Sequence, residues 1–151
     1  MGTSTFGSEM TQIRQERNLL NPLNEHEQAA VKVFVIPSRQ ERFLDFLANP
    51  KNRQKFTREL AHRRARFLNP KSLRAIPPSQ QNPESIASLL KRLGAGDTCW
   101  VLSEGPLDGE QVDLLYALNE VVGRGYGTII SCIAGNLAYF ESEDERYILQ
   151  K

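Results

Sequence analysis

Residues 127–142, GTIISCIAGNLAYFES, decide the fold class of this chain. The isoleucine-rich first part, 127–134, is typical of a buried strand. Gly135-Asn136 is a pair favoured in two-residue hairpin turns, and 137–142 then predicts the returning strand. Successive side chains of a strand point to opposite faces, so we expect one of Tyr139 and Phe140 in the core and the other outside it.

The segments on either side of this hairpin extend the pattern. Residues 98–103, TCWVLS, predict an earlier buried strand. Asp108 is the expected N-cap of a helix that runs to about residue 122, because Gln111 lies at the third helical position. Residues 146–150 add an optional fourth strand after the polar turn 142–145. The order is therefore β-α-β-β(-β), in which the helix would be a right-handed crossover if the first two strands were parallel.

The N-terminal half predicts helices separated by Asn-Pro pairs, which begin at residues 21, 49, 69 and 82. The residue before proline disfavours the helical region, while Asn is a good N-cap and Pro a good first helical residue. Helices are predicted over 9–20, from a capping box at 38–41 to about 48, over 51–68, and over 83–93 with Ile86, Leu89, Leu90 and Leu93 facing inward. Residues 31–36 fit either a helix or a strand, and the cap at Asn24 favours the helix.

Helices followed by strands predict an α+β fold, with an N-terminal helical array packed on a small C-terminal β-α-β-β(-β) sheet. We expect a disordered tail over 1–8 and a single domain over 9–151. That domain divides into a basic helical subdomain, 9–75, and an acidic α+β subdomain, 83–151. The expected core comprises Phe43, Leu47, Phe56, Leu60, Phe67, Ile86, Leu90, Trp100, Leu102, Leu114, Leu118, Ile130 and Ile133.

The composition narrows the functional classes. With 151 residues, 40% of them hydrophobic and 25% charged, the chain is unlike a disordered, collagenous or coiled-coil protein. It lacks an apolar run of about 20 residues, so we expect no membrane contact and a cytoplasmic location. Cys99 and Cys132 have neither a C-x-x-C nor a zinc-ligand spacing, so no metal or other cofactor is predicted.

The charge is divided unevenly along the chain. Residues 1–75 hold 14 Lys and Arg against 7 Asp and Glu, a charge of +7, whereas residues 76–151 hold 5 against 11, a charge of −6. Such asymmetry indicates either an anionic partner for the basic half or two halves that face each other. The sequence leaves open whether the halves would meet within one chain or between chains, and it leaves the oligomeric state open.

The strongest candidate site is a basic stripe on the predicted helix 51–68. Its members, spaced i, i+4, i+7, i+11 and i+15, are Lys51, Lys55, Arg58, His62 and Arg66. Such a stripe suits phosphate contacts, which need positive charge without base-specific geometry, and it also suits an acidic protein. The competing interpretation is a solvated helix face, because no known nucleic-acid-binding motif accompanies the stripe.

Three other features are weaker. The glycine-rich stretch 123–127, GRGYG, follows a helix and opens a strand, the reverse of the order in phosphate-binding loops. Four carboxylates near the end of the first strand lack a calcium-loop spacing; they are Glu104, Asp108, Glu110 and Asp113. Cys132 would need a base to act as a nucleophile, and the sequence places neither His26 nor His62 beside it.

We therefore predict no catalytic residue and a non-enzymatic intracellular interaction or regulatory module of unknown partner. The alternative is a nucleic-acid-binding protein that uses the basic helix 51–66. A second alternative is an enzyme with a site near Glu104 and Asp108 or at Cys132.

Overall fold

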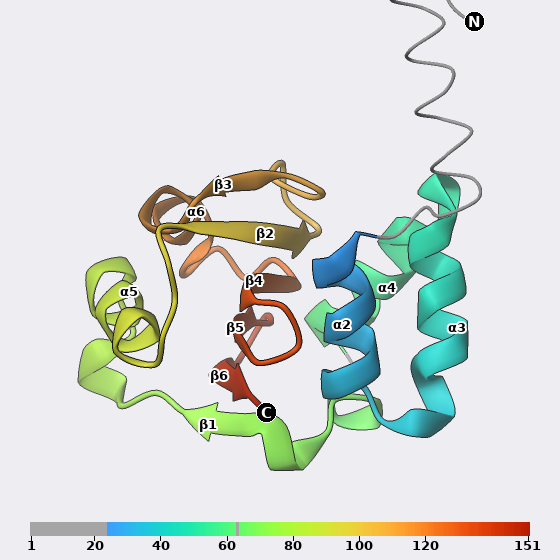
Figure 1. The fold of residues 1–151 in the computed structure, drawn as a ribbon, viewed down its shortest axis with the longest axis horizontal. Coiled ribbons are helices and arrows are strands. Elements are labelled where there is room, and N and C mark those ends of the chain that lie inside the picture. The colour runs from blue at the N-terminus through green and yellow to red at the C-terminus, as the bar shows by residue number, and fades with distance from the viewer. Residues whose placement is uncertain (1–23, 63) are drawn as a thin grey trace, which may run out of the picture.

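The structure is a computed structural model that describes residues 24–62 and 64–151. It confirms the α+β class: helices cover both faces of one six-stranded antiparallel sheet of order β1-β6-β5-β4-β2-β3 (Figure 1). The strands are β1 (Leu73–Ala75), β2 (Thr98–Ser103), β3 (Gln111–Asp113), β4 (Thr128–Ile133), β5 (Leu137–Glu141) and β6 (Arg146–Gln150). The α-helices are α2 (Glu25–Phe34), α3 (Pro37–Ala48), α4 (Arg53–His62), α5 (Pro83–Arg92) and α6 (Leu114–Val121). The predicted tail 1–8 and helix 9–20 lie outside the described residues, among which no helix has the length and apolar character to cross a bilayer.

The two faces of the sheet carry separate hydrophobic clusters. Helices α2, α3 and α4 pack on the face that presents Phe140, while α5 and α6 pack on the face that presents Tyr139. Both side chains are fully buried, so the expectation that only one of them lies in the core was wrong. Alternation along β5 places them on opposite faces as predicted, but helices from both halves of the chain cover those faces.

The sheet is larger than predicted because it has two edge strands, β1 and β3, that the sequence did not predict. Each is only three residues long. β1 pairs with β6 although residues 73–75 carry no strand signal, and β3 pairs with β2 where a helix was predicted. Asp108 is therefore not the helix cap; α6 begins at Leu114, and the Asp113 side chain accepts the Tyr116 amide at 3.0 Å. β2 and β4 are antiparallel neighbours, so the helix between them is not a parallel crossover.

Of the two helix starts predicted from capping residues in the N-terminal half, one is confirmed and one is wrong. The Asn24 side chain accepts the Glu27 amide at 2.8 Å, and residues 25–34 form a helix. Of the ambiguous stretch 31–36, the first four residues are therefore helical, while Val35 is extended and forms a β-bridge with Leu68. The capping box at 38–41 was wrong, because Pro37 is already the first helical residue and Ile36 makes no side-chain cap.

The predicted helix over 51–68 is the largest departure. Pro50–Asn52 forms a 3₁₀ turn, α4 ends at His62, and Arg64–Arg66 forms a second 3₁₀ turn. Pairing with the end of α2 explains the break: the Ile36 amide donates to Phe67 O, and the Asn69 amide donates to Phe34 O, both at 2.7 Å. A continued helix would use those backbone groups internally and carry them away from α2.

The hairpin turn and the core also differ in detail. The register of β4 and β5 shifts between Ser131 and Ile133, and three residues, 134–136, connect the strands instead of two. Of the expected core, all members are buried except Trp100 and Ile133, which are partly exposed. Leu93, predicted to face inward, is 39% exposed because α5 ends before it.

Candidate anion-binding groove

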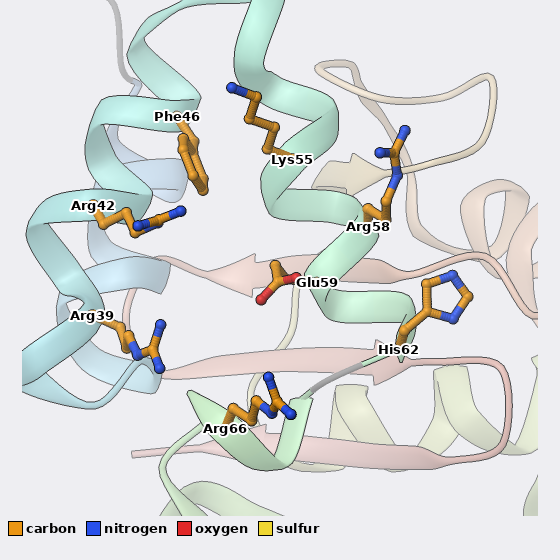
Figure 2. A pocket seen from close by; sticks show the side chains of 8 residues that line it. All are labelled: Arg39, Arg42, Phe46, Lys55, Arg58, Glu59, His62 and Arg66. Carbon is orange, nitrogen blue, oxygen red and sulfur yellow. The ribbon is translucent and has the colours of Figure 1, made fainter.

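The most highly charged hollow among the described pockets lies between α3, α4 and the 3₁₀ turn Arg64–Arg66 (Figure 2). We call it the cationic groove; its volume is about 470 Å³. Its lining consists of Arg39, Arg42 and Phe46 from α3, Lys55, Arg58, Glu59 and His62 from α4, and Arg66 from the turn. Five permanently charged cations therefore surround a space that one carboxylate shares.

The groove contains most of the predicted basic stripe. Lys55, Arg58, His62 and Arg66 line it, although Arg66 reaches it from the turn instead of from the helix. Lys51 lies in the 3₁₀ turn before α4 and is not among the lining residues. The predicted straight stripe along one long helix is thus wrong, because its residues lie on a helix and on the 3₁₀ turns at either end.

The sequence reasoning missed the α3 side of the groove. Arg39, Arg42 and Phe46 stand at i, i+3 and i+7, a spacing that places side chains on one face of a helix. That spacing is visible in the sequence. The sequence does not show that this face of α3 lies beside α4, because the core residues beneath the two helices determine how they pack.

Three buried phenylalanines hold the walls of the groove together from below. Phe43 of α3 packs edge-on against Phe56 of α4 at 5.3 Å between ring centroids and against Phe67 at 4.8 Å. All three are at most 1% exposed. Each edge-to-face pair contributes roughly 0.5–1.5 kcal/mol beyond its buried area. The segments that carry the cations are therefore fixed relative to one another.

The five cations of the groove lack anionic partners within the described part of the chain. Over residues 24–62 and 64–151, no ion pair involves the side chains of Arg39, Arg42, Lys55, Arg58 or Arg66. Arg42 and Lys55 lie over the half-buried Phe46 ring, with 5.1 Å and 5.7 Å to its centroid. Cation–π contacts orient these two groups without neutralising them. The groove therefore keeps a positive potential that attracts anions.

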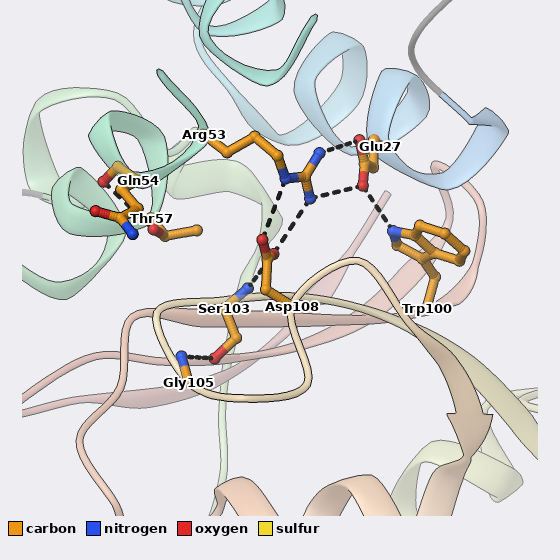
Figure 3. Close-up of polar contacts among 8 residues, drawn as sticks. All are labelled: Glu27, Arg53, Gln54, Thr57, Trp100, Ser103, Gly105 and Asp108. Atoms are coloured by element: carbon orange, nitrogen blue, oxygen red, sulfur yellow. Dashed lines mark hydrogen bonds and ion pairs between the residues drawn. The ribbon is translucent and has the colours of Figure 1, made fainter. Parts of the chain in front are cut away.

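A different set of basic residues joins the two halves of the chain. Arg53 binds Glu27 at 2.9 Å and Asp108 at 3.1 Å, and Trp100 Nε1 donates to Glu27 at 2.9 Å (Figure 3). Burial lowers the pKa of Arg53, but hydrogen bonds to the two carboxylates outweigh it and raise that pKa above its ordinary value. Asp108 also accepts the Ser103 amide at 3.0 Å. Its role is therefore to fix α4 against the loop after β2.

Two further pairs lie beyond the end of α4. Arg64 is ion-paired with Glu145, and His62 Nδ1 lies 2.9 Å from a Glu143 oxygen. The basic and acidic halves thus meet within one chain. Arg53, Arg64 and His62 therefore have carboxylate partners within the fold. None of these pairs involves the five cations of the groove.

The glycine-rich stretch 123–127 binds an anion that belongs to the protein itself. The amides of Gly123 and Gly125 donate to the fully buried Glu141 carboxylate at 3.0 Å and 2.8 Å. The carboxylates after β2 are separated in role, since Asp108 binds Arg53 while Asp113 caps α6. In the described part of the chain, no group of three or more His, Cys, Asp or Glu could hold a metal ion.

The thiols are poorly suited to nucleophilic chemistry. Burial raises the pKa of both Cys99 and Cys132 to about 12, so neither is a thiolate near neutral pH. Within the described part of the chain, the tertiary structure does not pair a histidine with Cys132. His26 Nδ1 lies 2.7 Å from the hydroxyl of Ser131 on the face that α2 covers, whereas Cys132 packs against the cluster under α5 and α6. Ser131 is only 1% exposed, and His26 is half-buried.

Comparisons of this chain with models of protein families, with curated proteins and with solved structures give no match. The charge and shape of the groove are therefore the features that bear on function.

Proposed function

We propose that this protein is a non-enzymatic binding module that holds the sugar–phosphate backbone of a nucleic acid in the cationic groove. The observation that carries the proposal is that five cations from three separate segments line one groove, without an ion-pair partner among residues 24–62 and 64–151. An interaction module was the primary expectation from the sequence, and the nucleic acid is the partner that the chemistry of the groove favours.

The arginines of the groove favour the phosphates of a nucleic acid over the carboxylates of an acidic protein. Four of the five cations are arginine, whose planar guanidinium presents paired N–H donors that fit phosphate oxygens. Their placement along one groove suits an anion with several phosphates, and the Phe46 ring offers an apolar contact for a base. Phosphate contacts position a strand without reading its sequence, so we expect weak sequence preference.

The test is a salt series with the full chain. Fluorescence anisotropy of labelled single-stranded RNA and DNA 12-mers would be measured from low to moderate salt. If all five cations contact phosphates, log K should fall against log salt with a slope of about −3 to −4. The triple variant Lys55→Glu, Arg58→Glu, Arg66→Glu should lose binding while its thermal midpoint stays close to that of the wild type, because exposed substitutions change stability little.

The matched control reverses three cations away from the groove: Lys32→Glu, Lys71→Glu, Arg92→Glu. All three are exposed, and the change in net charge equals that of the groove variant. Binding retained by the control and lost by the groove variant supports the proposal. Equal losses in both variants would show attraction by net charge alone, and no binding at low salt would overturn the proposal.

Two alternatives lead to other outcomes. An acidic protein partner would leave nucleic-acid binding absent and would make the groove variant defective in partner capture. An enzyme at Cys132 is disfavoured by the raised pKa of that thiol. The cytoplasmic location is part of the proposal, and the two free thiols support it, since such thiols persist in a reducing compartment.

A further inference from the structure

A second, smaller pocket lies on the other side of Arg58. Its lining is Gln54, Thr57 and Arg58 from α4, and Glu104 from the end of β2. We call it the polar pocket. Arg58 lines both the polar pocket and the cationic groove, so the two spaces are neighbours. In Figure 2 the Arg58 side chain points away from Arg39 and Arg42, toward the side opposite to α3.

The Glu104 carboxylate is held in place by the backbone around it. The Glu104 amide donates to Gly127 O at 3.0 Å, and one carboxylate oxygen accepts the Gly127 amide at 3.1 Å. Gly127 itself packs directly on α4, since a Cβ there would lie 2.4 Å from the Ala61 nitrogen. Glu104 therefore stands at a fixed position beside α4.

The part of the polar pocket beside Glu104 offers a free acceptor, while Gln54 and Arg58 line its other side. Among the described residues, only the Gly127 amide binds the Glu104 side chain, which leaves its second oxygen open. The Thr57 hydroxyl already donates to Gln54 O at 3.3 Å. A ligand group that contacts the open Glu104 oxygen therefore has to donate a hydrogen bond to it.

The volume limits what that group can be. The polar pocket measures about 180 Å³, the liquid volume of roughly six water molecules at about 30 Å³ each. This space is large enough for one sugar ring. In a nucleic acid, sugar and phosphate alternate, so a phosphate held by Arg58 brings a sugar to the polar pocket.

We propose that the polar pocket accepts a ribose, whose 2′-hydroxyl donates to Glu104, and that the partner of the groove is single-stranded RNA. The inference rests on the proposed function, because it needs a phosphate at Arg58. Carboxylates bind ribose hydroxyls in this way in dinucleotide-binding proteins. DNA lacks the 2′-hydroxyl, the group by which proteins distinguish RNA at a given site.

The test compares two strands that differ only at the sugar, a 12-mer of uridine and a 12-mer of deoxyuridine. With the wild-type full chain, the RNA should bind about ten-fold more tightly, the value of one hydrogen bond to a charged group. Glu104→Ala should bring the ratio close to one. Glu104→Gln keeps an oxygen for the Gly127 amide and should reduce the ratio part of the way, since neutral hydrogen bonds are about half as strong.

Glu110→Gln is the charge-matched control, because Glu110 is an exposed carboxylate of the same loop that does not line the polar pocket. It should keep the wild-type ratio. Equal binding of RNA and DNA by the wild type would overturn this inference and leave the proposed function standing. An RNA preference that persists in both Glu104 variants would also overturn it. No binding to either strand would overturn the proposed function as well.

Discussion

The buried carboxylate of Glu141 should be essential to the C-terminal half of the fold. Its side chain is fully buried and accepts four hydrogen bonds. The amides of Gly123 and Gly125 donate at 3.0 Å and 2.8 Å, the Tyr139 hydroxyl at 2.7 Å and Arg146 Nε at 3.3 Å. Because all four partners are donors, the site requires a group with two acceptor oxygens.

Glu141→Gln changes the volume little but turns one acceptor into a donor. If the new NH₂ group faces Gly125, that amide loses its acceptor; if it faces the other side, three donors are affected. A buried polar group left unpaired costs about 1–3 kcal/mol, and the remaining hydrogen bonds lose their charge assistance. We therefore expect the free energy of unfolding to fall by about 2–4 kcal/mol.

Urea unfolding followed by Trp100 fluorescence measures this change, since Trp100 is the only tryptophan. For a chain of this length the midpoint of thermal unfolding should fall by roughly 4–16 °C. Glu120→Gln, at an exposed carboxylate on α6, is the control and should stay within about 0.5 kcal/mol of the wild type. If Glu141→Gln also stays within that range, the assignment of Glu141 as an obligatory acceptor is wrong.

Three further predictions concern packing, pH and thiol chemistry. Gly127→Ala should destabilise the protein by about 1–3 kcal/mol in urea unfolding, because its Cβ would lie 2.4 Å from the Ala61 nitrogen; an unchanged midpoint would contradict this contact. The hydrogen bond from Arg64 holds the pKa of Glu145 below its ordinary value of 4.5, so its stabilisation is present above about pH 4.5 and is lost as the pH falls through the lowered pKa. Arg64→Gln should flatten the acid side of a stability-against-pH curve, and a curve as steep as that of the wild type would refute the linkage. Cys132 should react slowly with a thiol reagent at pH 8 in the native protein and rapidly in urea, since burial raises its pKa to about 12; rapid native labelling would restore the nucleophile alternative.

The tests of the groove and of the polar pocket are independent of the measurement on Glu141. Glu141 lies in the cluster of residues around Tyr139 and Gly123, whereas the groove is formed by α3, α4 and the turn that follows. A folded Glu141→Gln variant should therefore bind nucleic acid as the wild type does. This separation allows each result to be interpreted alone.

Local patterns in the sequence predicted elements whose hydrogen bonds close within a few residues. The Asn24 cap and the Asn82 cap each begin a helix as expected, because the side chain accepts an amide three residues later. Strand β2 matches its prediction to the residue, since a short apolar run rich in large side chains has few other stable conformations. The two caps depend only on neighbours along the chain, whereas the hydrogen bonds of β2 are made to β3 and β4, so only its strand character was visible locally.

Three of the failures share one physical cause. Residues 111–113 pair with β2 and become a strand, while the break after His62 follows from pairing of 67–69 with the end of α2. Both partners are distant in sequence, so no local window contains them. Tyr139 and Phe140 are both buried for the same reason, because helices from different parts of the chain cover the two faces of β5.

The candidate site divides in the same way. The sequence by itself determined that basic residues gather in the first half, and it predicted that five of them form one stripe, namely Lys51, Lys55, Arg58, His62 and Arg66. Only the tertiary structure decided that Arg39 and Arg42 join them across a groove, that Lys51 does not, and that Glu104 stands beside Arg58. Composition and periodicity set the charge of a segment, but the packing of Phe43, Phe56 and Phe67 decides which charged segments share one surface.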